Sequence, residues 1–172
     1  MSEASNKLNW CIKKAEKELK EKDIHRGLVV KEEDRALAAR HITKAEHNLK
    51  AALDFPKFGY SDWSPSAFFY SLYHCFLAIL AKFGYESRNQ ECSIAAIETL
   101  KEKGKINIDS KFIETLKINI DKEEQSAMKT REDFQYGTQL EFKETDEFNH
   151  LHNMCNELLE ETKKIVFELG KK

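Results

Sequence analysis

The stretch SPSAFFYSLYHCFLAILAKFG, residues 64–84, is apolar on nearly every side and predicts the helix around which the protein folds. A helix that is hydrophobic all round needs other elements around it, so we expect it at the centre of the core. Polar residues interrupt it, and it is too short for the roughly 20 apolar residues that span a bilayer. We expect Ser64 to cap it, with Pro65 at the first helical position. Small residues form a stripe where a neighbouring helix could approach closely: Ala67, Ser71, Cys75 and Ala78.

Helical spacing also marks the segments that precede this stretch. Residues 8–25 predict a charged helix that ends near Gly27. Residues 54–62, which contain Pro56 and Gly59, predict a loop. In residues 31–53 the apolar residues recur at intervals of four and three, which is typical of an amphipathic helix. These residues are Ala38, Ile42, Ala45, Leu49 and Ala52.

Three more helices are predicted after the central one. Residues 89–103 form a short helix, a long helix runs from Asp109 or Ser110 to about Tyr136, and residues 145–169 form the last. Sustained alternation of apolar and polar residues is missing from the sequence, so we expect almost no sheet. The fold class that follows is all-α, an antiparallel bundle of five to six helices. The last helix carries an apolar seam for packing on another helix: Phe148, Leu151, Cys155, Leu158, Thr162, Ile165 and Leu169.

The length and composition indicate one globular domain, residues 1–172, in which residues 1–28 form an N-terminal helical extension. The net charge of -2, from 28 basic and 30 acidic residues, argues against bulk DNA binding but leaves room for a local basic site. The four cysteines lie far apart and form no CxxC motif. The N-terminus is polar and lacks the apolar core of a signal peptide. We therefore expect a cytoplasmic protein with reduced thiols and no membrane association.

Arg131, in the stretch TREDFQYG at residues 130–137, is the best candidate for a functional group. The helical spacing places Glu124 and Arg131 on or beside an apolar stripe, and a partly buried charge needs a partner. Arg131 either pairs with a carboxylate on a neighbouring helix, reaches past the core edge to water, or lines a cleft and binds a phosphate through its planar guanidinium. The apolar stripe comprises Ile113, Leu116, Ile120, Ala127 and Phe134.

Asp133 and Tyr136 follow Arg131 and complete a candidate site for phosphate, RNA or a partner protein, together with Glu124. Five residues of continuous helix separate Arg131 and Tyr136 by roughly 140° around the axis. The two side chains therefore share a face only if the helix ends or bends there, which Gly137 favours.

We predict no metal site and no cofactor. His150 and His152 are two residues apart and do not face each other on a helix, and His152 with Cys155 supplies too few ligands for a closed zinc site. His74 is expected to be a hydrogen-bonded core histidine, and Cys75 a packing residue.

The central helix, with residues 66–80 followed by Phe83, Gly84 and Tyr85, resembles the core of HEPN domains, as does the preceding helix. The element from Arg131 to Tyr136 and Gly137 is similar to the arginine-then-tyrosine signature of the small archaeal and bacterial HEPN branch. The resemblance covers residues 31–169. It implies a compact all-α bundle that forms a homodimer. It also implies RNA or a nucleotide as ligand, or a small nucleotidyltransferase as partner in a toxin–antitoxin pair.

The ribonuclease members of that family carry an arginine and, a few residues later, a histidine on a late helix. Arg131 matches the arginine, but residues 135–138 include no histidine, and Tyr136 is a poor general base because tyrosine has a pKa near ~10. Two arginine–histidine pairs occur elsewhere: Arg35 with His41, and Arg40 with His47. Both lie on an early helix, and such short spacings arise by chance.

Three functions follow from these residues. The first is a HEPN-like module that binds RNA, a nucleotide or a nucleotidyltransferase. The second is an active ribonuclease that uses Arg131 with an unconventional base, or with His150 or His152 brought near by the fold. The third is a structural helical dimer without a ligand, in which Arg131 forms a core ion pair. Both catalytic and non-catalytic functions therefore stay open at this point.

Overall fold

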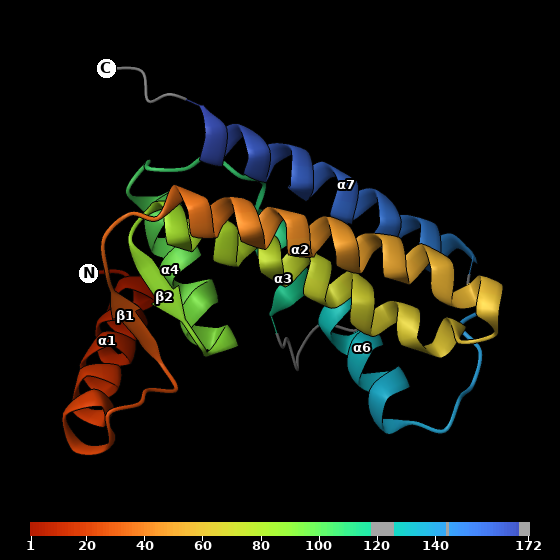
Figure 1. The fold of residues 1–172 in the computed structure, drawn as a ribbon, viewed down its shortest axis with the longest axis horizontal. Helices are drawn as coiled ribbons and strands as arrows, with labels where there is room; N and C mark the ends of the chain where they lie inside the picture. Colours follow the sequence, from red (N-terminus) through yellow and green to blue (C-terminus); the bar gives the residue numbers. More distant parts are fainter. Residues whose placement is uncertain (118–125, 144, 169–172) are drawn as a thin grey trace.

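The computed structural model describes residues 1–117, 126–143 and 145–168, and it is predominantly helical (Figure 1). Seven α-helices lie within the described residues, so the all-α class is confirmed and the expected count of five to six was too low. The elements in chain order are α1 (Glu3–Lys22), β1 (Leu28–Val30), α2 (Arg35–Asp54), the 3-10 helices η1 (Phe55–Phe58) and η2 (Ser61–Trp63), α3 (Ser64–Lys82), β2 (Tyr85–Ser87), α4 (Gln90–Glu102), α5 (Ser110–Leu116), α6 (Ala127–Tyr136) and α7 (Thr145–Phe167).

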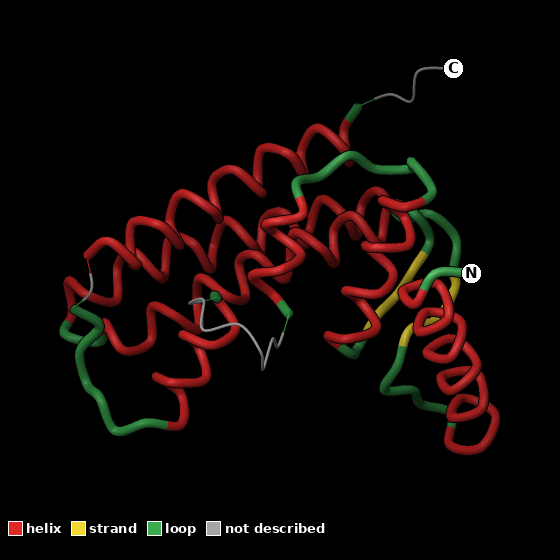
Figure 2. Tube along the Cα trace, turned by 180° about the vertical axis from the view of Figure 1, so that it is seen from behind, coloured by secondary structure: helices red, strands yellow, loops and turns green. Residues whose placement is uncertain are grey.

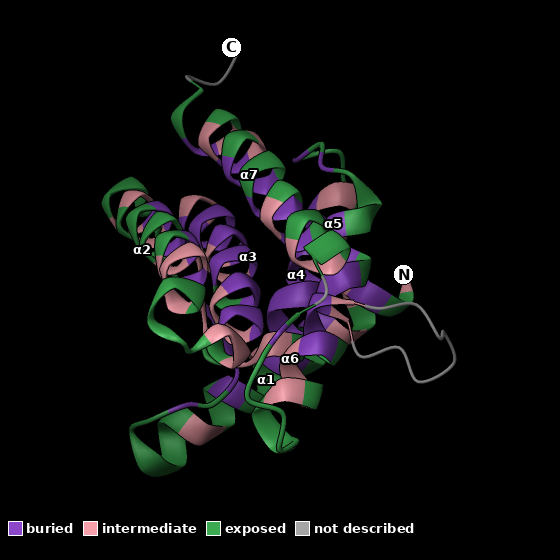
Figure 3. Ribbon diagram, turned by 90° about the vertical axis from the view of Figure 1, so that its right-hand side faces the viewer, coloured by how far each residue is buried: buried purple, intermediate pink, exposed green. Residues whose placement is uncertain are grey.

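Helix α3 is the centre of the core, as its composition predicts. It contacts α2, α4, α5, α6 and α7, and it is buried along most of its length (Figure 3). The segment Ser61–Lys82 is long and apolar enough to cross a membrane by length and composition, with a mean hydropathy of 1.2. Yet 67% of that window is buried inside the protein, which is the situation of a core helix. Six of its large side chains are almost completely enclosed: Phe68, Phe69, Leu72, Phe76, Ile79 and Leu80.

Helix α2 packs closely against the small-residue stripe of α3. The Ser71 hydroxyl donates a hydrogen bond to the carbonyl of Ala45 over 2.9 Å, and Ser64 donates to the carbonyl of Ala52 over 2.8 Å. Residue numbers fall on α2 as they rise on α3, so the two helices are antiparallel. The expectation that Ser64 caps α3 and that Pro65 is its first residue was wrong. Ser64 is the first helical residue and Pro65 the second, and Trp63 takes the cap position without a side-chain bond.

The predicted long helix from Asp109 to Tyr136 is wrong. Helix α5 ends at Leu116, because Lys117 adopts an extended conformation with ψ 145°. Helix α6 then begins anew at Ala127, where the Ser126 hydroxyl accepts a hydrogen bond from the Lys129 amide over 3.1 Å. The apolar spacing could not reveal the break, since both parts bury residues at helical intervals.

Helix α7 follows the predicted seam from Phe148 to Ile165 and packs on α3 and α2 of the same chain. Leu169, the last residue of that seam, lies outside the described residues. Leu151, Cys155 and Leu158 are buried, and the Cys155 thiol donates to the carbonyl of Phe68 over 3.5 Å. The apolar seam of α7, which could have packed against a partner chain, thus packs against helices of its own chain.

The N-terminal segment forms α1 and a small antiparallel sheet, in which Leu28 pairs with Ser87 and Val30 with Tyr85 (Figure 2). Helix α1 ends at Lys22, earlier than Gly27, because Asp23 adopts a left-handed conformation with φ 57°. Helix α1 lies against α4 and β1.

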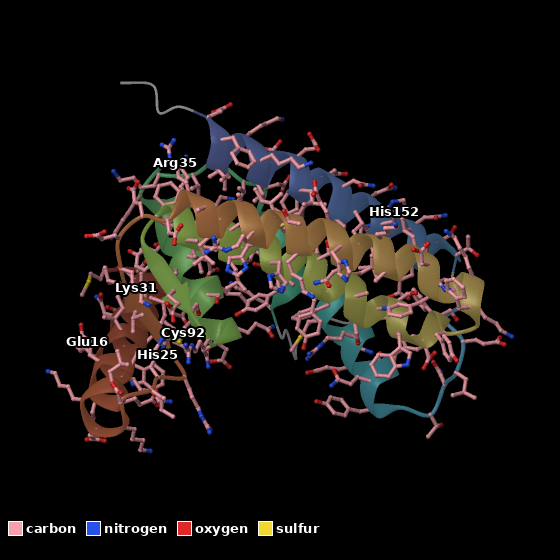
Figure 4. The ribbon with its side chains drawn as sticks, in the orientation of Figure 1. Glu16, His25, Lys31, Arg35, Cys92 and His152 are labelled. Atoms are coloured by element: carbon pink, nitrogen blue, oxygen red, sulfur yellow. A yellow bond between two sulfur atoms is a disulfide. The ribbon has the colours of Figure 1, made fainter. Side chains whose placement is uncertain are left out.

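A disulfide joins Cys11 of α1 to Cys92 of α4, and the side chain of Cys92 lies on the α1 side of α4 (Figure 4). The expectation that all thiols are reduced is therefore wrong. The two cysteines are 81 residues apart in sequence, and the spacing gave no sign that the fold would bring their Cα atoms to 5.9 Å. Cys75 and Cys155 remain free thiols and are buried, as expected for packing residues.

Candidate functional site

Arg131 lies on α6, where that helix packs against α3. Three contacts position α6: its cap at Ser126, the Ala127 amide donating to the Thr115 hydroxyl of α5 over 3.0 Å, and the Thr130 hydroxyl donating to Glu147 of α7. The guanidinium carbon of Arg131 then lies 4.5 Å from the centroid of the Phe69 ring on α3. A cation over an aromatic face is attracted by the ring's negative quadrupole.

The charge of Arg131 has weak compensation in this setting. Its side chain is 12% exposed, and its ion-pair partner in the described part of the chain is the adjacent Glu132, at 3.8 Å. One terminal nitrogen reaches the Tyr70 hydroxyl and the other the Met128 sulfur, both at 3.5 Å, while the buried Nε has no hydrogen-bond partner. These contacts are long for a guanidinium. The cross-helix ion pair is thus not formed among the described residues, and a donor remains unused.

The other residues of the predicted site do not converge on Arg131. Asp133 is exposed and pairs with Lys129 on its own helix over 2.8 Å. Tyr136 is 76% exposed at the last residue of α6, which ends at Gly137 as the sequence predicted. Glu124, like Ile120 of the predicted apolar stripe, lies outside the described residues. The site built around Arg131 therefore involves Phe69, Tyr70 and Met128, which sequence reasoning did not select.

A second polar group, His74, lies one turn along α3 from Tyr70. Tyr70 and His74 are four residues apart and are neighbours on the helix surface. The Nδ1 atom of His74 lies 3.0 Å from Nδ1 of His41 on α2, and the two ring centroids are 5.2 Å apart. His74 is thus hydrogen-bonded, as the sequence predicted, but it is half-buried at the edge of the core.

The surroundings of both imidazoles disfavour their charged forms and lower their pKa values. Burial, followed by the charges of His41 and Lys44, lowers the pKa of His74 to about 4. Burial and then Arg40 lower the pKa of His41. A bound anion would favour protonation of both rings, because an opposite charge stabilises the imidazolium form. The sequence marks His41 only by an arginine–histidine spacing with Arg35, which was attributed to chance. The spacing of residues along one helix could not show that His41 would contact His74 of another helix.

The remaining histidine candidates lie elsewhere. His152 is on α7 and lines a groove against α2 together with Lys50 and Lys163, on the side of α2 away from α6 (Figure 4). His150 is exposed on α7. Among the described residues no three His, Cys, Asp or Glu side chains gather as a metal site would require.

The fold and the site define a predominantly helical protein with a small two-stranded sheet and a partly buried, weakly compensated arginine at a helix junction. The chain matches no protein-family model, and comparisons with the curated proteins and with the solved structures give no match.

Proposed function

We propose that this protein is a HEPN-like helical module that binds RNA or a nucleotide, with Arg131 holding a phosphate. The observation that supports this best is the state of the Arg131 guanidinium: it is held against Phe69, with one carboxylate at 3.8 Å and an unpartnered Nε. Partly buried charge is costly unless it is compensated, and a phosphate matches the planar fork of arginine.

Binding without cleavage fits the groups around Arg131 better than ribonuclease activity does. Tyr136 is exposed and does not converge on Arg131, and a tyrosine is a poor general base at neutral pH. His74, one turn along α3 from Tyr70, has a pKa of about 4. A base with so low a pKa has little affinity for the proton it would have to remove. The ribonuclease alternative therefore has less support than a binding role.

The proposal includes a homodimer and a small nucleotidyltransferase as a partner in a toxin–antitoxin pair, as the HEPN resemblance implies. A cytoplasmic location is also part of the proposal, although the Cys11–Cys92 disulfide gives it no support. The resemblance rests on the central helix and on the element from Arg131 to Tyr136. Sedimentation velocity of the purified chain tests the homodimer, and a monomer across the concentration range would remove that part of the proposal.

Fluorescence anisotropy of a short labelled single-stranded RNA, measured at ~0.1 M salt, tests the proposal. Arg131→Met keeps the aliphatic contact with Phe69 and removes the charge, and we expect it to weaken binding at least about tenfold, since a charge-assisted hydrogen bond contributes roughly 1.5–3 kcal/mol. The affinity of Arg131→Lys should fall between those of the wild-type protein and Arg131→Met, because lysine keeps the charge but lacks the planar guanidinium.

The matched control is Arg26→Met, which removes the same charge from an exposed position before β1. It should leave the affinity within about twofold, as distant surface charges are largely screened. Failure of the wild-type protein to bind RNA or any nucleotide, or equal affinities for the two methionine variants, would overturn the proposal. Electrophoresis of the RNA after incubation reports cleavage, and cleavage lost in Arg131→Met would replace the binding role with the ribonuclease one.

A further inference from the structure

Helices α2 and α3 carry a local excess of positive charge, although the whole chain has a net charge of -2. Together they hold five Lys or Arg residues against two acidic residues, Glu46 and Asp54. Glu46 pairs with Lys163 of α7 over 2.9 Å, and Asp54 pairs with Lys57 over 2.7 Å. Both carboxylates are therefore engaged, whereas Arg40 and Lys44 are close enough to His41 and His74 to lower their pKa values.

The exposed side of α3 is lined by aromatic side chains next to this charge. Trp63, the cap residue before α3, and Tyr70 on α3 are seven residues apart, which corresponds to about two helical turns along one side. They are 59% and 42% exposed. His74 follows one turn after Tyr70 on α3. The Tyr70 hydroxyl itself lies 3.5 Å from a terminal nitrogen of Arg131 on α6. Tyr70 thus contacts Arg131 of α6 and lies one turn from His74 at the α2–α3 seam, while Trp63 lies about two turns before Tyr70, at the start of α3.

The histidine pair suits an anion better than a metal ion. Two imidazoles supply too few ligands for a closed zinc site. Arg40 and Lys44 would also repel a divalent cation at this position, by the same field that disfavours the imidazolium forms. A phosphate, in contrast, would be attracted by both cations and could accept a hydrogen bond from either ring.

We infer that the ligand is a single-stranded RNA longer than one nucleotide, which lies along α3 with one phosphate at Arg131, a base against Tyr70 or Trp63, and a further phosphate at Lys44, His41 and His74. Basic groups that track a backbone, interleaved with exposed aromatic rings, are the features by which proteins hold single strands. This inference rests on the proposed function and adds to it a second subsite and the class of ligand. An acidic peptide would fit the charges but would leave the aromatic rings without a role.

Anisotropy titrations with a labelled mononucleotide and a labelled eight-nucleotide RNA test the inference. We expect Lys44→Gln and His74→Gln each to weaken binding of the RNA about three- to tenfold, and Lys44→Gln to lower the magnitude of the salt slope by about 0.7, while neither changes mononucleotide affinity. The control is Lys50→Gln, which removes the same charge from α2 on the side that faces α7. It should leave both affinities unchanged.

The outcomes separate this inference from the proposed function. If RNA binding depends on Arg131 but Lys44→Gln behaves like Lys50→Gln, the second subsite is wrong and the proposed function stands. If neither ligand binds, or if Arg131→Met changes neither affinity, both fail. If an unlabelled polyglutamate peptide of equal charge displaces the RNA more strongly than unlabelled RNA does, the surface is a peptide site and the assignment to RNA is wrong. Circular dichroism of each variant confirms that it is folded.

Discussion

The guanidinium of Arg131 lies 4.5 Å above the Phe69 ring, so the same side chain both packs α6 against α3 and presents a charge. The packing and the charge are separable by substitution. We expect Arg131→Ala to lower the free energy of unfolding by about 1–2 kcal/mol, through loss of the cation–π contact and of the aliphatic stem. Arg131→Met should cost less than about 1 kcal/mol, because it keeps the stem. Urea unfolding measures both, and equal losses would contradict this division.

The Cys11–Cys92 disulfide should stabilise the protein substantially, because it closes a loop with a sequence separation of 81 residues. Replacing both cysteines by serine is expected to lower the free energy of unfolding by about 2–4 kcal/mol. Thiol alkylation under denaturing conditions checks the bond itself: two cysteines, Cys75 and Cys155, should react without reductant, and all four after reduction. Four reactive thiols before reduction would restore the original expectation of reduced cysteines.

Gly84 should be far less replaceable than Gly104, although both have positive φ, at 77° and 65°. A Cβ at Gly84 would lie 2.5 Å from the backbone oxygen of Lys31, which belongs to the loop after β1, whereas a Cβ at Gly104 meets nothing within 4 Å. Gly104→Ala should cost about 1 kcal/mol from backbone strain alone. Gly84→Ala should cost clearly more, since backbone atoms would have to move. Similar melting temperatures for the two variants would show that β1 and β2 are not packed as described.

The stability of the protein should fall as the pH is lowered from 6.5 toward 4, partly through His74. The folded-state pKa of His74, about 4, is below its usual 6.5 because of burial and then the nearby His41 and Lys44. In this window the unfolded chain binds more protons than the folded chain, so acidification favours unfolding. His74→Gln should show a shallower decline, by about 1 kcal/mol after allowance for solvent screening of a half-exposed ring. Urea unfolding at several pH values in this range measures the free energy of unfolding of both proteins. An equally steep decline in the wild-type protein and in His74→Gln would exclude His74 as the cause.

The sequence predicted the core of the fold because the core depends on local periodicity. The apolar residues 64–84 became the buried α3, and the spaced apolar residues of α2, from Ala38 to Ala52, are all buried as predicted. The break between α5 and α6 escaped prediction because it depends on the extended backbone at Lys117 and on the cap at Ser126. Both are weak local signals inside a segment whose apolar spacing continues across them.

The sequence predicted one residue of the candidate site, Arg131, but not the residues around it. An arginine on an apolar stripe stands out in the sequence, and Arg131 is indeed largely enclosed. Its neighbours Phe69 and Tyr70 are 62 and 61 positions earlier, so only the packing of α6 on α3 brings them together. The same holds for His41 and His74, and for Cys11 and Cys92, whose pairings depend on the tertiary arrangement of helices.

The salt dependence of RNA binding tests the central claim, that Arg131 holds a phosphate, most directly. Each phosphate contact to a single strand contributes about 0.7 to the slope of log affinity against log salt concentration. We predict that Arg131→Met lowers the magnitude of this slope by about 0.7 relative to the wild-type protein and to Arg26→Met. A slope that is unchanged in Arg131→Met, whatever the loss of affinity, would contradict a phosphate contact at Arg131.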